Sequence, residues 1–279
     1  GWPIHLSGAF SAYNGIDAPR KLMIMETEYP SGPLRPWSDH HDIILRWYDH
    51  WLKGIDTGIM EEPPIRLFIK GKNEWRDEYE WPLARTHWTK LYLRKEGVLS
   101  EDPPGQNEGS DSFINKPWPL PRDVLPGVQY MTAPLKQDTE TTGPIALYLW
   151  ASLDQQDATW IVAVNDVAPD GSRRLVSKGW LKASHKPIDQ QRSKPYQPFH
   201  PHTESISVEP GKVCEYAIDI REASNVFRAG HQIELVIKGQ DAPSEDPIWF
   251  HLCNIKETNH TIYHTNQYMS YLLLPLIPG

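Results

Sequence analysis

Residues 46–54 read Arg-Trp-Tyr-Asp-His-Trp-Leu-Lys-Gly, and this stretch is typical of the last turns of an amphipathic helix. Apolar residues recur at helical spacing and define one face: Ile44, Trp47, Tyr48 and Trp51. Ser38 is a suitable N-cap, and Gly54 is placed for the left-handed conformation that ends many helices. The sequence therefore predicts a helix over residues 38–53.

The composition excludes several classes of protein. The chain has 279 residues, of which 39% are apolar, enough to build a packed core. Its formal net charge is -8 and it has no run of lysine or arginine, so neither nucleic acid nor an anionic membrane is an expected partner. No apolar run is long enough to span a bilayer. No signal-peptide pattern opens the sequence and there are only two cysteines, which favours a cytoplasmic protein.

The first 60 residues have the pattern of an α/β unit. Residues 20–25 form a short apolar run that predicts a buried strand, and the helix follows at the distance of a parallel crossover. One strand and one helix cannot bury both faces of a parallel strand, so we expect further chain before residue 1. We interpret residues 1–60 as the last strand and helix of an α/β domain.

From residue 61 onward the pattern is that of a β protein. The step Glu61-Glu62-Pro63-Pro64 interrupts the chain, and residues 65–69 then alternate between apolar and polar. Further strand-like segments follow at regular spacing, separated by turn signals: residues 88–93, 128–132, 145–151, 159–167, 174–183, 204–208, 213–220, 231–238 and 261–264. Residues 100–127 are expected to be a long loop. The fold class that we predict for residues 61–279 is a β-sandwich, most simply a jelly roll.

Several segments of this sequence resemble the C-terminal part of the CocE/NonD (cocaine esterase-like) and X-Pro dipeptidyl-peptidase hydrolases. The segments that carry the resemblance are residues 47–58 (WYDHWLKGIDTG), 74–76 (EWR), 80–86 (EWPLART), 142–144 (TGP), 166–171 (DVAPDG), 227–231 (FRAGH), 261–264 (TIYH) and 272–278 (LLLPLIP). The resemblance implies an α/β-hydrolase domain followed by a galactose-binding-like jelly roll. It also implies serine hydrolysis of small esters or amides, with this chain supplying the C-terminal portion and an N-terminal hydrolase portion as its partner.

The catalytic residues of such a hydrolase are not found where they are expected. The nucleophile elbow Gly-x-Ser-x-Gly is absent, and Ser11 has neither the spacing nor a preceding strand. The resemblance places the histidine base in the loop after the last strand, but residues 26–37 contain no histidine. His40 and His41 lie just beyond this loop and are the only candidates for the base. The alternative, which we favour, is that both belong to the first turn of the helix, because geometry outranks residue type in assigning a base.

Two kinds of binding site can also be considered. His200-Pro201-His202 resembles a zinc-binding pair, but the proline argues against a strand and no Cys or carboxylate lies at ligand spacing. Nothing in the sequence indicates a cofactor or metal. The 12 tryptophans raise the possibility of a carbohydrate-binding jelly roll, since exposed indoles stack on sugars. We expect instead that six of them fill the sandwich core or the domain junction: Trp75, Trp81, Trp88, Trp150, Trp160 and Trp180.

Three functions therefore remain open. The chain is the C-terminal part of a serine hydrolase, which shapes the substrate pocket and makes oligomer contacts. Alternatively, it belongs to a catalytically inactive relative that acts as a binding or scaffold protein, or it is a carbohydrate-binding jelly roll. Because an unpaired parallel strand leaves apolar surface uncovered, we also expect the isolated chain to self-associate unless its N-terminal portion is present.

Overall fold

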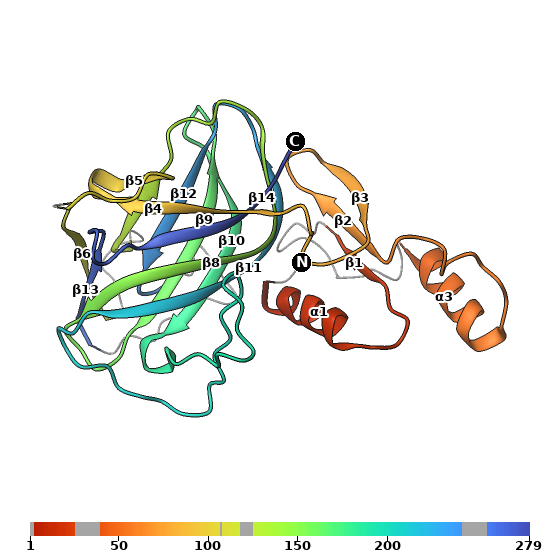
Figure 1. Ribbon diagram of the computed structural model, residues 1–279, viewed down its shortest axis with the longest axis horizontal. Helices are drawn as coiled ribbons and strands as arrows, with labels where there is room; N and C mark the ends of the chain where they lie inside the picture. The colour runs from red at the N-terminus through yellow and green to blue at the C-terminus, as the bar shows by residue number, and fades with distance from the viewer. Residues whose placement is uncertain (1–2, 26–39, 107, 118–124, 242–255) are drawn as a thin grey trace. The chain divides into compact units, whose positions relative to one another are not determined.

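A computed structural model describes residues 3–25, 40–106, 108–117, 125–241 and 256–279 of the chain (Figure 1). The chain divides into two compact units, Gly1–Ala84 and Arg85–Gly279. The first unit contains two described helices and three strands, and the second consists of strands. None of the described helices is long and apolar enough to cross a bilayer.

The first unit is built on a three-stranded sheet in the order β1-β2-β3. Its elements are α1 (Pro3–Gly15), β1 (Leu22–Ile24), α3 (His41–Lys53), β2 (Ile65–Ile69) and β3 (Glu74–Glu78). β1 and β2 are parallel, with Leu22 opposite Ile65, whereas β2 and β3 are antiparallel. The predicted parallel strand is therefore present, but it pairs with a later segment and is half-buried rather than buried on both faces. The reason is that β1 is the terminal strand of the described sheet.

Helix α3 confirms the amphipathic helix predicted from the sequence, with a later start. It begins at His41 with His40 as the N-cap, and His40 makes no side-chain capping hydrogen bond. Ser38, the predicted N-cap, lies outside the described residues. Gly54 ends the helix as predicted, with φ of 66°, and the Ile55 N–H donates to the Asp49 carbonyl oxygen at 3.1 Å. This left-handed residue turns the chain out of the helix and ends it.

The compact units divide between Ala84 and Arg85, after the strands β2 and β3. The physical reason is strand pairing, because β2 and β3 complete the sheet that β1 begins. Phe10 in α1 stacks on Trp81 with ring centroids 4.2 Å apart, which places residue 81 in the first unit as well.

The second unit contains eleven strands of one hydrogen-bonded sheet. They are β4 (His87–Arg94), β5 (Val98–Ser100), β6 (Ser110–Asn115), β7 (Gly127–Met131), β8 (Thr139–Leu153), β9 (Thr159–Val167), β10 (Arg173–Lys182), β11 (Cys214–Phe227), β12 (Gln232–Lys238), β13 (Thr258–Tyr263) and β14 (Tyr271–Ile277). Short 3-10 turns lie at η1 (Lys95–Gly97) and η2 (Ala183–His185). Two expectations were wrong: residues 204–208 form no strand, and β6 lies within the expected loop 100–127.

The sheet closes on itself to form a two-layered, sandwich-like structure. Its order is β11-β10-β9-β12-β7-β5-β4-β14-β8-β13-β6, and β11 also pairs with β8 along most of its length. The closed sheet has two weak seams, at which neighbouring strands share a single residue pair. Gly179 pairs with Ile220 between β10 and β11, and Val98 pairs with Met131 between β5 and β7. These seams separate the layer β10-β9-β12-β7 from the layer containing β5, β4, β14, β8 and β11.

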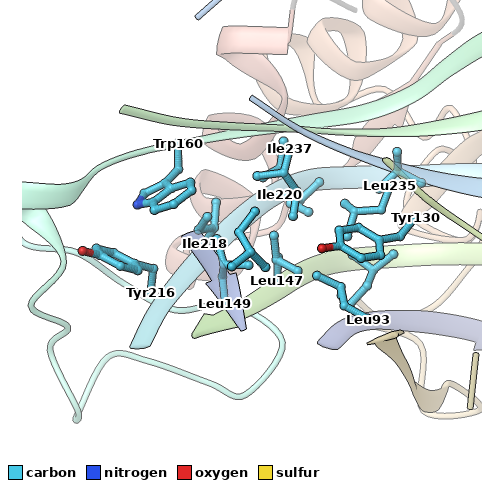
Figure 2. Close-up of a cluster of buried hydrophobic side chains, with 14 of the residues drawn as sticks. Leu93, Tyr130, Leu147, Leu149, Trp160, Tyr216, Ile218, Ile220, Leu235 and Ile237 are labelled. Atoms are coloured by element: carbon cyan, nitrogen blue, oxygen red, sulfur yellow. The ribbon is translucent and has the colours of Figure 1, made fainter. Parts of the chain in front are cut away.

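Apolar side chains from both layers meet in one core. Trp160 of β9 and Leu235 of β12 come from one layer, and Leu147 of β8 and Ile218 of β11 come from the other (Figure 2). All four are fully buried, as is Tyr130, whose hydroxyl donates to the Asp111 carboxylate at 2.8 Å. The side chains of the two layers therefore build a single core.

We predict that Gly179→Ala destabilises the second unit. A Cβ at this seam would lie 2.5 Å from the Asp219 carbonyl oxygen, closer than real Cβ atoms approach, so β10 and β11 must move apart. The expected loss is about 1–3 kcal/mol in the free energy of unfolding, measured by urea denaturation. Gly105→Ala is the matched control, since its Cβ would meet only the Glu108 carboxylate at 3.6 Å. Equal stability of the two variants would contradict the close approach.

A buried histidine gives the second unit a pH-dependent stability. His260 in β13 is fully buried, stacks on Phe113 with centroids 4.6 Å apart and meets the edge of Trp160. Burial lowers the pKa of His260 to about 4. The unfolded chain keeps the ordinary histidine pKa, so at pH values between about 4 and that pKa it binds a proton more readily than the folded chain does. The free energy of unfolding therefore decreases as the pH falls through this range.

We predict that His260→Phe removes this pH dependence while keeping the stacked ring. Between pH 7 and pH 5 the unaltered chain should lose about 2 kcal/mol more unfolding free energy than the variant. Urea midpoints at the two pH values measure the difference. His87→Gln, at an exposed position on β4, serves as the control and should keep the pH profile of the unaltered chain. Parallel profiles for His260→Phe and the unaltered chain would show that this histidine is not the source.

Candidate functional site

The candidate catalytic residues of the sequence do not meet in the first unit. Ser11 lies on the exposed side of α1, in the middle of a helix rather than on a strand-to-helix turn. His40 is the N-cap residue of α3 and meets the edge of Trp75 with ring centroids 6.0 Å apart, and His41 is exposed. Within the described part of the chain, neither histidine hydrogen-bonds to a serine or a carboxylate.

Both histidines lie at the start of α3, where His40 is the N-cap residue and His41 is the first residue of the helix. The favoured alternative, that they belong to the start of the helix, agrees with these positions.

The second unit brings two of the sequence motifs together at one end of the sandwich. Residues 166–171 include the end of β9, and residues 227–231 begin at the last residue of β11. The two segments meet through a contact between His231 and Asp166. The His231 Nδ1 atom lies 2.7 Å from Asp166 Oδ1. Arg174 donates to Asp166 Oδ2 at 2.8 Å and to Asn225 Oδ1 at 2.7 Å. Asp166 is thus nearly buried with a cation on one oxygen and an imidazole on the other.

A second carboxylate lies beside this group on β12. Glu234 is fully buried and accepts hydrogen bonds from Asn165 at 2.9 Å and from Arg173 Nε at 3.1 Å. Because burying an unpaired charge is costly, these partners explain how the carboxylate is tolerated.

This polar network has only part of what hydrolysis needs. His231 and Asp166 have the arrangement of a base and the carboxylate that orients it. No serine, threonine or cysteine hydroxyl or thiol hydrogen-bonds to His231 among the residues that the structure describes. Arg228 pairs with Asp138 at 2.7 Å, and the Ala229 N–H donates to the same carboxylate. The network therefore ties turns together. Sequence reasoning missed the His231–Asp166 contact because the two residues lie far apart in the chain.

An aromatic row lies across three neighbouring strands of the second layer. Tyr271 of β14 is opposite both Tyr92 of β4 and Tyr148 of β8. Tyr271 stacks on Tyr148 with centroids 5.0 Å apart, and the Lys90 ammonium lies 4.2 Å from the Tyr271 ring centroid. Burial raises the pKa of Tyr271 to about 12. Tyr148 and Lys90 therefore both lie against the Tyr271 ring.

The tryptophans only partly follow the prediction that they are core residues. Trp160 is fully buried in the sandwich core and Trp81 is buried in the first unit. Trp75 is 36% exposed, and three others are half-buried: Trp88, Trp150 and Trp180. Trp88 stacks face to face on Tyr196 with centroids 4.3 Å apart. The alternation of a strand cannot distinguish a core face from a covered outer face, which explains the difference.

Histidines gather in the loop between β10 and β11. The His200-Pro201-His202 segment is not a strand, as the proline predicted. The two ring nitrogens of His200 lie 3.0 Å and 2.7 Å from the carbonyl oxygens of Pro187 and Ala217. His202 Nδ1 lies 3.3 Å from His185 Nδ1. No local sequence pattern indicates this last contact, because the two histidines come from separate segments.

Two further histidines lie in or directly after β13 (Thr258–Tyr263): His260 and His264. Both are buried, and His264 Nε2 lies 3.1 Å from Asp111 Oδ2. Both positions alternate with half-buried residues along the chain, so they point inward. Aromatic packing accommodates His260, and the nearby carboxylate accommodates His264.

Comparisons with known proteins agree with the resemblance seen in the sequence. Residues 57–273 match the family described as X-Pro dipeptidyl-peptidase C-terminal non-catalytic domain. The chain is 29% identical over 238 residues to a Mycobacterium bovis protein that carries the provisional name of a serine esterase, covering 76% of this chain and 38% of that protein. It is 26% identical over 266 residues to the cocaine esterase of a Rhodococcus species, covering 85% of this chain and 43% of the esterase.

A solved structure supports the same fold. The crystal structure of a CocE/NonD family hydrolase from Staphylococcus aureus superposes with a TM-score of 0.84 at 20% identity, over 98% of this chain and 52% of that one. The chain thus spans about two-fifths of the length of the curated relatives it matches. The family match begins at residue 57, before the compact units divide. The matched region covers most of the sequence, and the chain belongs to the family of X-Pro dipeptidyl-peptidase C-terminal non-catalytic domains.

Proposed function

We propose that this chain is the C-terminal portion of a serine hydrolase that acts on small esters or amides and holds its catalytic serine elsewhere. The observation that carries the proposal is the family match over residues 57–273, to a domain described as non-catalytic. The absence of a Gly-x-Ser-x-Gly elbow from the sequence is consistent with it. Residues 1–56 are, in this proposal, the end of an α/β-hydrolase domain, and the second unit is a jelly roll.

The free surfaces of the first unit support a missing partner. β1 is the terminal strand of the described sheet, so its outer edge can pair with a preceding strand. Helix α3 has no buried residue, although its sequence is strongly amphipathic. Its apolar side chains are largely exposed: Leu45 by 51%, Tyr48 by 52%, Trp51 by 46% and Leu52 by 75%. A contiguous apolar patch of this kind is typical of an interface.

The proposed partner is the N-terminal hydrolase portion of the same protein. In the intact protein, the chain contributes to the wall of the substrate pocket and to contacts between copies. Without the N-terminal portion, the same apolar surface is expected to drive self-association. The hydrolase portion covers this surface in the intact protein, and a second copy covers it in the isolated chain. Burial of apolar side chains drives both associations.

A catalytically inactive relative is the second candidate function. Residues 26–37 contain no histidine where the family resemblance places the base, and His40 and His41 lie at a helix N-terminus. If the intact protein lacks a base, the chain serves as part of a binding or scaffold protein. A nucleophile elbow in the sequence before residue 1 would favour the hydrolase.

The carbohydrate-binding alternative has less support. Sugars stack on exposed aromatic faces, but Lys90 and Tyr148 cover Tyr271, and Trp88 lies against Tyr196. Trp75 is the most exposed of the six tryptophans expected in the core or the domain junction, and Arg66 lies over its ring at 5.3 Å from the centroid.

We predict that the chain by itself does not hydrolyse p-nitrophenyl acetate above the rate of a heat-denatured control. The reason is the absence of a nucleophile elbow from its sequence. A fluorophosphonate probe, which labels activated serines, should also leave the chain unlabelled. Saturable turnover would contradict the proposal. Its loss in Ser11→Ala would then identify the nucleophile, and its loss in His41→Asn or His40→Asn would identify the base.

We predict that the isolated chain self-associates at micromolar concentration and that Leu52→Glu shifts it toward the monomer. The glutamate places a charge in the apolar patch of α3, where burial against a partner would be costly. Light scattering measures the mass. His41→Glu adds the same charge at the exposed N-terminus of α3, where an anion is favourable, and should leave association unchanged. A monomeric unaltered chain would remove this support for a missing partner.

A further inference from the structure

Two histidines from separate segments meet at the end of strand β10. His185 closes the 3-10 turn η2, which follows β10 without a break. Its neighbour Ser184 is buried and donates to the Asp157 carboxylate through both its backbone N–H and its hydroxyl, at 2.8 Å and 2.9 Å. The turn that carries His185 is therefore held firmly on the sandwich.

The second histidine lies on a loop that is anchored on both sides. Before it, His200 is nearly buried with both ring nitrogens against backbone carbonyls. After it, the Ile206 N–H donates to the Ser184 carbonyl oxygen at 2.8 Å, which joins the loop to η2. His202 itself has φ of 54°, a left-handed conformation that is uncommon for a residue other than glycine. Strained backbone of this kind often accompanies a functional site.

The two rings present equivalent nitrogens to each other. His185 Nδ1 and His202 Nδ1 lie 3.3 Å apart, and the ring centroids are 5.2 Å apart. Zinc bonds to histidine nitrogen at about 2.0–2.1 Å, so two nitrogens on one tetrahedral zinc are about 3.4 Å apart. The observed separation therefore matches that of two ligands of a single ion.

We infer that His185 and His202 form a two-histidine chelate for a divalent transition-metal ion, with zinc as the test ion. The ion would join η2 to the 199–206 loop, with water completing its coordination. Among the described residues, no third His, Cys, Asp or Glu is placed to join the pair. His200 is not free to do so because backbone carbonyls face both its nitrogens.

An imidazole ligates a metal ion only in its neutral form, so both rings must be uncharged for the ion to bind. The competing explanation is a single N–H···N hydrogen bond between two neutral rings, which needs no metal. The two explanations differ in whether zinc binds at this place.

Calorimetric titration of the full chain with zinc chloride at pH 7.5, in a buffer that does not chelate zinc, distinguishes them. We expect one zinc bound per chain with both histidines present, and an affinity at least tenfold weaker in His185→Asn and in His202→Asn. Asparagine tolerates the left-handed conformation, so the second variant should fold. Thermal unfolding without zinc checks that both variants fold.

The control is His87→Asn, which removes an exposed histidine on β4 and should leave zinc affinity within twofold. As a second readout, Cu²⁺ should broaden the imidazole NMR signals of His185 and His202 at substoichiometric amounts. Absence of zinc binding, or binding unchanged in both variants, would overturn the chelate and leave the pair as a hydrogen bond between neutral rings.

Discussion

The ladder between β8 and β11 is the constraint on which the second unit depends. These long strands pair from Thr139 with Phe227 to Ala151 with Cys214, and β8 also borders β14 and β13 on its other edge. The ladder closes the sheet, so the apolar faces of both layers enclose one core. A closed sheet also leaves fewer free edges for pairing with other chains. The weak seam at Gly179 is tolerated because this ladder already fixes β11.

Charged groups at one end of the sandwich fix the turns that the ladders leave free. Asp166 and Glu234 are buried carboxylates, and each is satisfied by an arginine together with a second polar partner. Buried ion pairs add little net stability, yet loss of one partner leaves a costly unpaired charge. The His231–Asp166 contact resembles part of a catalytic site, but its role here is to join two turns. A likeness of residue types is therefore weaker evidence for catalysis than the presence of a nucleophile in reach.

The two units differ in how completely they bury their apolar residues. The second encloses a core of its own, whereas α3 in the first has no buried residue and exposes Leu45, Tyr48, Trp51 and Leu52. Such a difference is expected if the first unit is a portion of a larger domain, which is the proposal that the family match supports. The histidine pair His185 and His202 is independent of this question, since both residues belong to the second unit.

The sequence alone determined the elements with strong local signals. Helical periodicity and Gly54 predicted α3, and alternation predicted most strands of the sandwich, because each depends on neighbours in the chain. Only the tertiary structure decided which strands pair, so that β2 and β3 lie in one sheet with β1. It alone also brought His231 to Asp166 and His202 to His185, since contacts between distant residues leave no local pattern. Burial of His260 depended in the same way on the rings that surround it.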